Sequence, residues 1–153
     1  MITYTTGDIF KANTEALVNP VNCVGVMGKG LALEFKKRFP HNFQEYKSAC
    51  DGDLFDIGLM FITGPYKKIP KYIINFPTKK DWRNPSQIEW IEEGLIALRK
   101  TITEYEIESI AIPALGVGNG GLKWSSVKPL MEYRLHDLSS VVNIVVYTPQ
   151  QIG

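Results

Sequence analysis

The chain has 153 residues and a formal net charge of +1, with 44% hydrophobic and 22% charged residues. This is the length of one domain, and it is long enough to bury a core without disulfides or metals. The near-neutral charge gives no overall field that would attract nucleic acid, although a local basic patch is compatible with it. No signal-like N-terminal stretch and no run of about 18 apolar residues is seen, so we expect a cytosolic protein and no membrane partner.

Apolar, β-prone runs alternate with helical patterns along the chain, which is typical of an α/β fold. Helices between strands favour parallel neighbours with helices on both faces. The two strands expected between residues 59 and 76 can pair as a hairpin, so the predicted sheet is mixed. In chain order we expect an edge strand at Ile2–Thr6, a strand at Ala16–Val21, helices at Leu31–Phe39 and Asn42–Ala49, strands at Leu59–Thr63 and Tyr72–Phe76, a helix at Ser86–Thr103, a strand at Ser109–Ala114, a helix at Lys123–Leu138 and a strand at Val141–Thr148.

Two of these helices have clear boundary signals. Pro40 is expected to end the first helix. Ser86 and Glu89 have the spacing of a capping box, which predicts that Ser86 caps the third helix. One apolar stripe is expected to bury this helix, and it comprises Ile88, Ile91, Leu95, Leu98 and Ile102.

Two glycine-rich segments, Cys23–Gly30 (CVGVMGKG) and Gly116–Gly121 (GVGNGG), each follow an expected strand and precede an expected helix. Glycine lets the backbone approach a ligand closely, and free N–H groups near a helix N-terminus attract phosphate oxygens. Two such loops in one small domain therefore favour a phosphate-bearing nucleotide over plain turns. Neither loop has the GxGxxG spacing or the GK[ST] ending, so a P-loop kinase is disfavoured.

Three polar side chains near the first strands allow either a ligand contact or a purely local role. Asp8 could accept a hydrogen bond from an adenine amino group, or it could cap a turn. Asn19 and Asn22 lie on either side of Pro20 in an apolar run, where amides need partners. They could hold ribose hydroxyls, or they could bond only to the loop backbone.

A basic loop is expected at Thr78–Pro85. Lys79 and Lys80 could provide an amine nucleophile for an anomeric carbon, or they could be solvated charges. Trp82 and Arg83 suit base stacking and phosphate contact, although the tryptophan could instead pack over the edge of the domain.

The remaining reactive side chains give weaker signals. Cys23 and Cys50 lack metal-site spacing and are expected to be reduced thiols. Cys23 lies beside a glycine-rich loop but has no obvious histidine partner, so packing is favoured over catalysis. His41 and His136 do not suggest a triad, and no metal is expected because no HExxH or paired-carboxylate pattern is present.

The segments TTGDIF, ALVNPVNCVGVMGKGLALEFKKRFP and IPALGVGNGGLKW occur in the order found in the macrodomain family, which this chain resembles from about Ile2 to Thr148. With NFPTKKDWRNPS, it is similar to the macrodomain of the DarG antitoxins, a branch related to the human terminal ADP-ribose protein glycohydrolase. The resemblance implies a three-layer α/β/α sandwich around a mixed, mostly parallel sheet. It implies one macrodomain over residues 1–153, as the N-terminal domain of a longer antitoxin.

The activity implied by this resemblance is that of a DNA ADP-ribosyl glycohydrolase, which removes ADP-ribose from thymidine in single-stranded DNA. Such a protein would be the antitoxin of a DarT-type, NAD-dependent DNA ADP-ribosyltransferase, contacting the toxin mainly through a further C-terminal domain. ADP-ribose would be the ligand, no cofactor would be needed, and the protein would be a cytoplasmic monomer. The alternatives are a non-catalytic ADP-ribose reader and a hydrolase of protein-linked ADP-ribose or of small ADP-ribose metabolites.

The resemblance also assigns roles to residues. Lys79 would be catalytic, or Lys80 if the register is shifted by one. Gly120 lies where the human relative has an aspartate paired with its lysine, so Lys79 would act with water and the substrate's own groups, or with another acid. Trp82 and Arg83 would contact DNA. The implied ADP-ribose contacts are Asp8, Ile9, Asn19, Asn22, Gly25, Val26, Met27, Gly28, Lys29, Gly30, Leu115, Gly116, Val117, Gly118, Asn119, Gly120 and Gly121.

Overall fold

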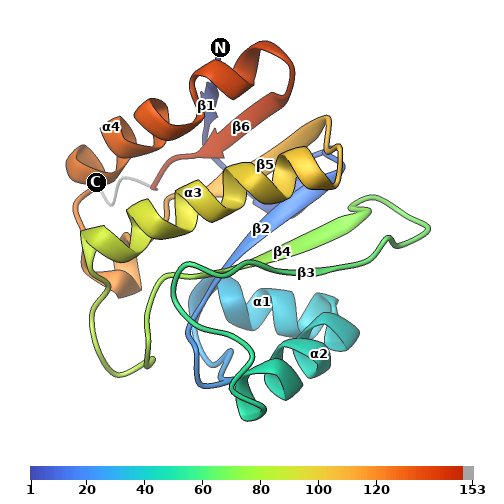
Figure 1. The fold of residues 1–153 in the computed structure, drawn as a ribbon, viewed down its shortest axis with the longest axis vertical. Helices are drawn as coiled ribbons and strands as arrows, with labels where there is room; N and C mark the ends of the chain where they lie inside the picture. Colours follow the sequence, from blue (N-terminus) through green and yellow to red (C-terminus); the bar gives the residue numbers. More distant parts are fainter. Residues whose placement is uncertain (150–153) are drawn as a thin grey trace.

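A six-stranded sheet with the strand order β1-β6-β5-β2-β4-β3 lies at the centre of the molecule (Figure 1). The computed structural model describes residues 1–149. All neighbouring strands are parallel except β3 and β4, which are antiparallel, so the prediction of a mixed, mostly parallel sheet is confirmed. The strands are β1 (Thr3–Thr5), β2 (Ala16–Val21), β3 (Phe61–Thr63), β4 (Tyr72–Pro77), β5 (Ser109–Pro113) and β6 (Asn143–Tyr147).

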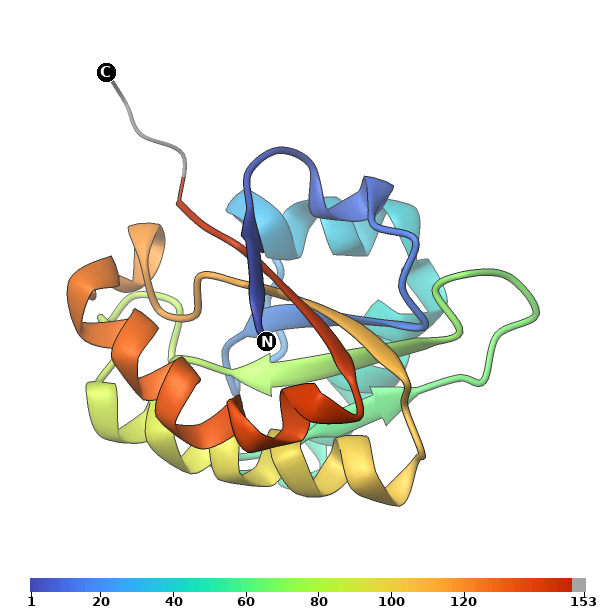
Figure 2. The same ribbon diagram turned by 90° about the horizontal axis from the view of Figure 1, so that it is seen from above.

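Helices cover both faces of the sheet, as the alternation of strands and helices predicts. The pair α1 (Gly30–Arg38) and α2 (Pro40–Asp51) lies on one face, and the pair α3 (Ile88–Glu104) and α4 (Trp124–Leu135) lies on the other (Figure 2). Three short 3-10 helices lie within the described residues: η1 (Ile9–Lys11) follows β1, η2 (Gly118–Gly120) follows β5, and η3 (Asp137–Ser140) follows α4. None of the helices within residues 1–149 is both long and apolar enough to cross a membrane.

The core is divided between the two faces because successive strand side chains point in opposite directions. On β2, Ala16 and Val18 belong to the cluster under α3 and α4, whereas Leu17 packs with Phe35 of α1. The stripe predicted on the third helix is confirmed, since its members at 91, 95, 98 and 102 are essentially fully buried and Ile88 packs against the same cluster.

The predicted edge strand and hairpin are also confirmed. Strand β1 pairs with β6 and forms one edge of the sheet in the part of the chain that the structure describes. Strands β3 and β4 pair antiparallel, with Thr63 opposite Ile73. This hairpin places β4 between β3 and β2, so the basic loop that follows β4 lies beside the first glycine-rich loop that follows β2.

The predicted capping box is wrong. Helix α3 begins at Ile88 with Gln87 as its N-cap residue, and that cap makes no side-chain hydrogen bond. Ser86 instead donates its backbone N–H to the carbonyl of Gly120 at 2.8 Å. This contact with the second glycine-rich loop holds Ser86 outside the helix. A tertiary hydrogen bond therefore overrides the local capping pattern.

Other boundaries differ by a few residues. Pro40 ends the first helix as predicted, but it is also the first residue of α2, a position that suits its fixed φ and missing N–H. Helix α4 stops at Leu135, and residues 137–140 form a 3-10 turn where the sequence predicted more α-helix.

Candidate functional site

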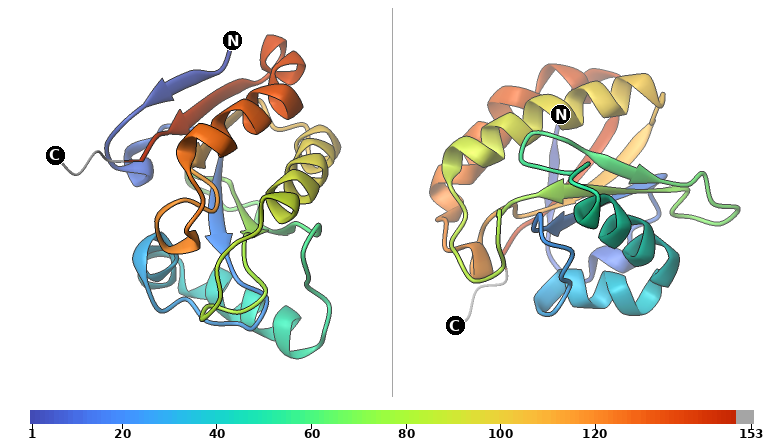
Figure 3. Two further views of the ribbon diagram at one scale, coloured as in Figure 1. Left: turned by 90° about the vertical axis from the view of Figure 1, so that its left-hand side faces the viewer. Right: turned by 60° about the horizontal axis from the view of Figure 1, so that its bottom comes forward.

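A cleft of about 410 Å³ opens at the carboxyl ends of β2, β4 and β5. Three loops form its walls: residues 22–29 after β2, residues 78–87 after β4, and residues 114–121 after β5. The loops lie together on the left of Figure 1, and the left panel of Figure 3 views the molecule from their side. Open α/β sheets bind ligands at this end of their strands, and the volume is in the range of small-molecule sites, roughly 300–1,000 Å³.

The first glycine-rich loop is organised by Asn22. Its Nδ2 donates to the carbonyl of Val26 at 2.7 Å, and its Oδ1 accepts the N–H groups of Val24 and Val26 at 3.1 and 3.3 Å. Gly25 has a φ of +80°, a left-handed conformation that suits glycine. The Asn22 amide therefore satisfies the loop backbone, one of the two roles predicted for it, while the residue also lines the cleft.

The second glycine-rich loop approaches the first one closely. A Cβ at Gly30 would lie 2.9 Å from Nδ2 of Asn119, so glycine at the start of α1 allows the two loops to touch. Helix α1 begins at this point, and Lys29, its N-cap residue, makes no side-chain cap bond. The first N–H groups of α1 and the backbone of both loops are thus close to the cleft, an arrangement that suits a phosphate.

The structure separates the two candidate lysines. Lys79 lines the cleft, and its Nζ donates to the carbonyl of Trp82 at 3.3 Å. Lys80 does not line the cleft; its Nζ lies 5.6 Å from the ring centroid of Trp90, and its carbonyl accepts the N–H of Cys23 at 3.1 Å. The geometry therefore favours the register in which Lys79 acts on a ligand.

Trp82 lies at the mouth of the cleft, and Arg83 lies beside it. Trp82 lines it with 47% of its surface exposed. Arg83 lies 5.5 Å from the Trp82 ring centroid and binds Asp81 through two hydrogen bonds of 3.0 and 2.8 Å. These bonds from the guanidinium lower the pKa of Asp81 to about 2, so the pair is ionised at neutral pH.

The family model for the Macro domain matches residues 18–131, a range that holds all three cleft loops. The chain belongs to the macrodomain family. The solved macrodomain of Mycobacterium tuberculosis DarG superposes with a TM-score of 0.95 at 51% identity, covering 98% of this chain and 99% of that one. The predicted family and its α/β fold are confirmed.

Relatives with a named activity are similar to this chain over almost its whole length. DNA ADP-ribosyl glycohydrolases of Mycobacterium tuberculosis and Thermus aquaticus are 52% and 49% identical over 151 residues, which is 97% of this chain. The chain spans 42% and 41% of the length of these curated relatives. A Thermosipho africanus DarTG structure in complex with ADP-ribose matches with a TM-score of 0.90 at 34% identity, over 99% of this chain and 43% of that one.

The cleft of this macrodomain contains about half of the residues predicted from sequence. Seven further residues line the cleft and were not predicted. They directly adjoin the predicted loops, at the ends of strands and in the first turn of α1, and this adjacency is the sequence signal that could have identified them. The predicted residues that line the cleft are Asn22, Val26, Gly28, Lys29, Lys79, Trp82, Gly116, Val117, Asn119 and Gly120. Those that do not are Asp8, Ile9, Asn19, Gly25, Met27, Gly30, Lys80, Arg83, Leu115, Gly118 and Gly121. The additional lining residues are Pro20, Val21, Leu31, Ala32, Thr78, Pro113 and Ala114.

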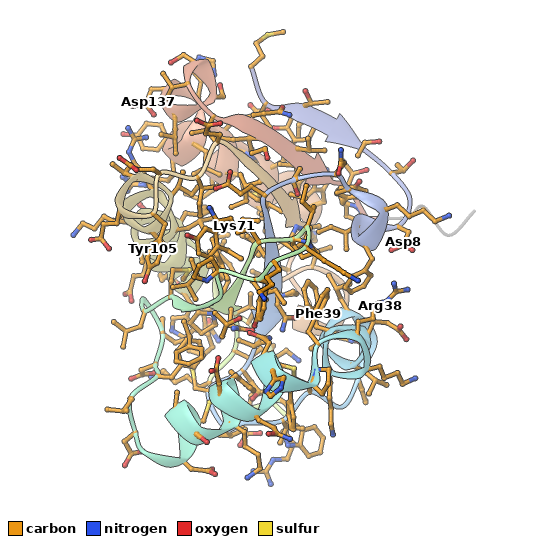
Figure 4. The ribbon with its side chains drawn as sticks, turned by 90° about the vertical axis from the view of Figure 1, so that its right-hand side faces the viewer. Asp8, Arg38, Phe39, Lys71, Tyr105 and Asp137 are labelled. Atoms are coloured by element: carbon orange, nitrogen blue, oxygen red, sulfur yellow. The ribbon has the colours of Figure 1, made fainter. Side chains whose placement is uncertain are left out.

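Asp8 caps a turn, which is one of the two roles that the sequence allows for it. Its Oδ1 accepts the N–H of Phe10 at 2.9 Å and so caps η1. Figure 4 shows Asp8 on the same side of the molecule as Arg38 and Phe39 at the end of α1. The contact with adenine stays a prediction.

Asn19 belongs to a buried amide cluster behind the cleft. It is 0% exposed, and its Nδ2 donates to Oδ1 of Asn75 at 3.1 Å and lies 3.8 Å from the sulfur of Met27. A direct ribose contact by Asn19 stays a prediction, and this geometry favours an indirect role beneath the first loop.

Cys23 is poorly suited to nucleophilic chemistry. Burial, with the charge of Asp56 as the next cause, raises the pKa of its thiol to about 12, so almost none is thiolate at neutral pH. Within residues 1–149, no group of three or more His, Cys, Asp or Glu side chains is placed to hold a metal ion.

Proposed function

We propose that this macrodomain is a DNA ADP-ribosyl glycohydrolase that removes ADP-ribose from thymidine in single-stranded DNA, as the antitoxin of a DarT-type ADP-ribosyltransferase. The observation that carries the proposal is the position of Lys79 in the cleft between the two glycine-rich loops. Two kinds of relative support it: glycohydrolases at 49–52% identity, and a Thermosipho africanus protein that fuses a DNA ADP-ribosyl transferase to such a glycohydrolase, at 34% identity.

ADP-ribose is the ligand we assign to the cleft. Backbone N–H groups of the two loops and of the start of α1 would hold the diphosphate, and this anchoring would keep the anomeric carbon still beside Lys79. Trp82 at the mouth and Arg83 beside it would contact the thymine or the adjoining DNA strand. The ADP-ribose complex of the Thermosipho africanus relative supports this ligand.

The bond to be broken joins the anomeric carbon of ribose to a thymine ring nitrogen. Lys79, as a neutral amine, could attack that carbon while the bonding electron pair leaves with the base, which then takes up a proton. Ring opening with loss of the lysine proton gives an imine, and water releases ADP-ribose and restores the amine. A protonated Lys79 could instead stabilise the departing base electrostatically while water attacks the carbon. Borohydride trapping of a covalent adduct would identify the first route.

Among the described residues, Lys79 forms no ion pair with an acidic side chain. The resemblance to the human relative implies that Gly120 lies where that protein has its aspartate. The chemistry we propose therefore uses the lysine with water and substrate groups, which is consistent with both routes above.

The decisive experiment uses a single-stranded oligonucleotide with ADP-ribose on thymidine and measures release of free ADP-ribose. We expect release by the wild type and by Lys80→Ala, and a loss of at least 100-fold for Lys79→Ala, the typical contribution of one catalytic group. Lys80 is the matched control because it is the adjacent lysine and lies outside the cleft. Loss of ADP-ribose release in Lys80→Ala alone would show that Lys80 is the catalytic lysine.

Two further outcomes would select the alternative functions. Tight ADP-ribose binding without release from DNA would make the domain a reader. Release from an ADP-ribosylated protein but not from the oligonucleotide would make it a hydrolase of protein-linked ADP-ribose.

A further inference from the structure

Helix α2 carries two buried polar side chains one turn apart, Asn42 and Tyr46, and both are 0% exposed. Asn42 is paired with Asn75 on β4: Nδ2 of Asn42 donates to Oδ1 of Asn75 at 3.1 Å, and Nδ2 of Asn75 donates to Oδ1 of Asn42 at 2.8 Å. Strand β4 leads directly into the loop with Lys79. One end of α2 is therefore fixed to the strand that positions the lysine.

Tyr46 connects the same helix to the first glycine-rich loop. Its hydroxyl lies 2.7 Å from Oδ1 and 2.8 Å from the carbonyl oxygen of Asn22, so its single proton is shared between two acceptors on one residue. Burial raises the pKa of this hydroxyl well above its usual range, which keeps it protonated and able to donate at neutral pH. The ring packs edge-on against Phe55, which fixes the direction of the hydroxyl.

Asn22 relays this contact to the rest of the loop. The Oδ1 atom that meets the Tyr46 hydroxyl also accepts the N–H groups of Val24 and Val26. The loop has no regular secondary structure, and Val24 and Val26 are 45% and 37% exposed. Met27 anchors the later part of the loop in the core cluster that contains Tyr46, and the N–H of Cys23 bonds to the carbonyl of Lys80. Between these two anchors, the conformation of residues 24–26 depends mainly on the hydrogen bonds that converge on Asn22.

We propose that Tyr46 is a positioning residue that presets the first glycine-rich loop for ADP-ribose. Asn42, one turn earlier, fixes the strand of Lys79, so α2 sets the separation between the loop and the lysine. A loop held in its binding conformation before the ligand arrives loses less conformational freedom on binding, which raises affinity. The inference rests on the proposed ADP-ribose site, but not on the identity of the nucleic acid or protein to which ADP-ribose is attached.

Tyr46→Phe tests this role because it removes the hydroxyl and keeps the packed ring. We expect calorimetry with free ADP-ribose to show binding weaker by about fivefold to tenfold, the equivalent of one net hydrogen bond. Hydrogen exchange at the amides of Val24 and Val26 should become faster. Tyr4→Phe is the matched control, because Tyr4 also donates to a side chain, Glu132 at 2.7 Å, but lies away from the cleft.

A merely structural role for Tyr46 predicts a different result. Tyr46→Phe would then lower the melting temperature while ADP-ribose affinity and the exchange of both valine amides stay at wild-type values, and that result would overturn the proposal. Equal losses of affinity in Tyr46→Phe and Tyr4→Phe would also overturn it. Failure of the wild type to bind ADP-ribose would instead refute the proposed function.

A second variant covers the case in which Tyr46→Phe does not fold. Asn22→Ala removes the side-chain acceptor and leaves the backbone carbonyl, and it should speed exchange of the same two valine amides. If both single variants fold, the double variant can be measured as well. It should bind ADP-ribose no more weakly than the weaker of the two single variants, because the hydroxyl acts through Asn22. Additive losses would contradict the relay.

Discussion

The backbone N–H of Ser86 donates to the carbonyl of Gly120 at 2.8 Å, and a Cβ at position 120 would lie 2.6 Å from the Ser86 hydroxyl. The end of the basic loop is thereby packed directly against the second glycine-rich loop, which lines the cleft through Gly120. Glycine is required here by this close approach rather than by its backbone dihedrals. The same contact explains why Ser86 does not cap α3.

Gly120→Ala should destabilise the protein by about 1–2 kcal/mol, since the new methyl group overpacks the contact with Ser86. Chemical denaturation measures the free energy of unfolding. Gly28→Ala is a suitable control for stability, because its Cβ would meet only a side-chain carbon of Val26 at 3.5 Å. The double variant Gly120→Ala with Ser86→Ala should recover part of the loss, whereas strictly additive effects would show that the two residues do not interact.

Trp82→Ala should raise the KM for an ADP-ribosylated oligonucleotide by about tenfold, because stacking on one base contributes roughly 1–3 kcal/mol. Binding of free ADP-ribose should be nearly unchanged, since the carbonyl of Trp82 that accepts from Lys79 remains. Tyr133→Ala provides a control at a side chain that is 76% exposed on α4. Equal losses with oligonucleotide and with free ADP-ribose would refute a DNA contact by Trp82.

Cys23 should react very slowly with iodoacetamide in the folded protein at pH 8, and Cys23→Ser should retain glycohydrolase activity. The raised thiol pKa stabilises the native state below the ordinary value of 9.0, and this contribution is lost as the pH rises through about 12. Stability measured between pH 8 and pH 11 should therefore fall less steeply in Cys23→Ser than in the wild type. Rapid alkylation of Cys23 at pH 8 would contradict this assignment.

The choice between Lys79 and Lys80 shows where sequence reasoning reached its limit. Adjacent residues in an irregular loop have no periodicity that fixes their directions, so the sequence left both lysines open. The structure separates them because Lys80 faces Trp90 of α3 and its carbonyl pairs with Cys23, whereas Lys79 faces the cleft. Its catalytic role stays a prediction until the oligonucleotide assay is done.

The two asparagines on either side of Pro20 also show that a local sequence pattern does not identify long-range partners. Their apolar surroundings predicted that both amides need partners. The Nδ2 of each has one, whereas Oδ1 of Asn19 is buried without a partner among the described residues. Asn22 bonds to its own loop, a local arrangement that the sequence allowed for. Asn19 bonds to Asn75 across the sheet, and no local pattern could have indicated that partner.

The sequence alone determined the α/β class, the strands and helices, the buried stripe of α3 and the two glycine-rich loops. These features depend on short-range periodicity and on the conformational freedom of glycine, both of which are local. Only the tertiary structure decided which side chains face the cleft and which buried side chains hold the cleft loops in position. Asn42 meets Asn75 and Tyr46 meets Asn22 across separations of 33 and 24 residues, and such contacts arise only when distant elements pack together.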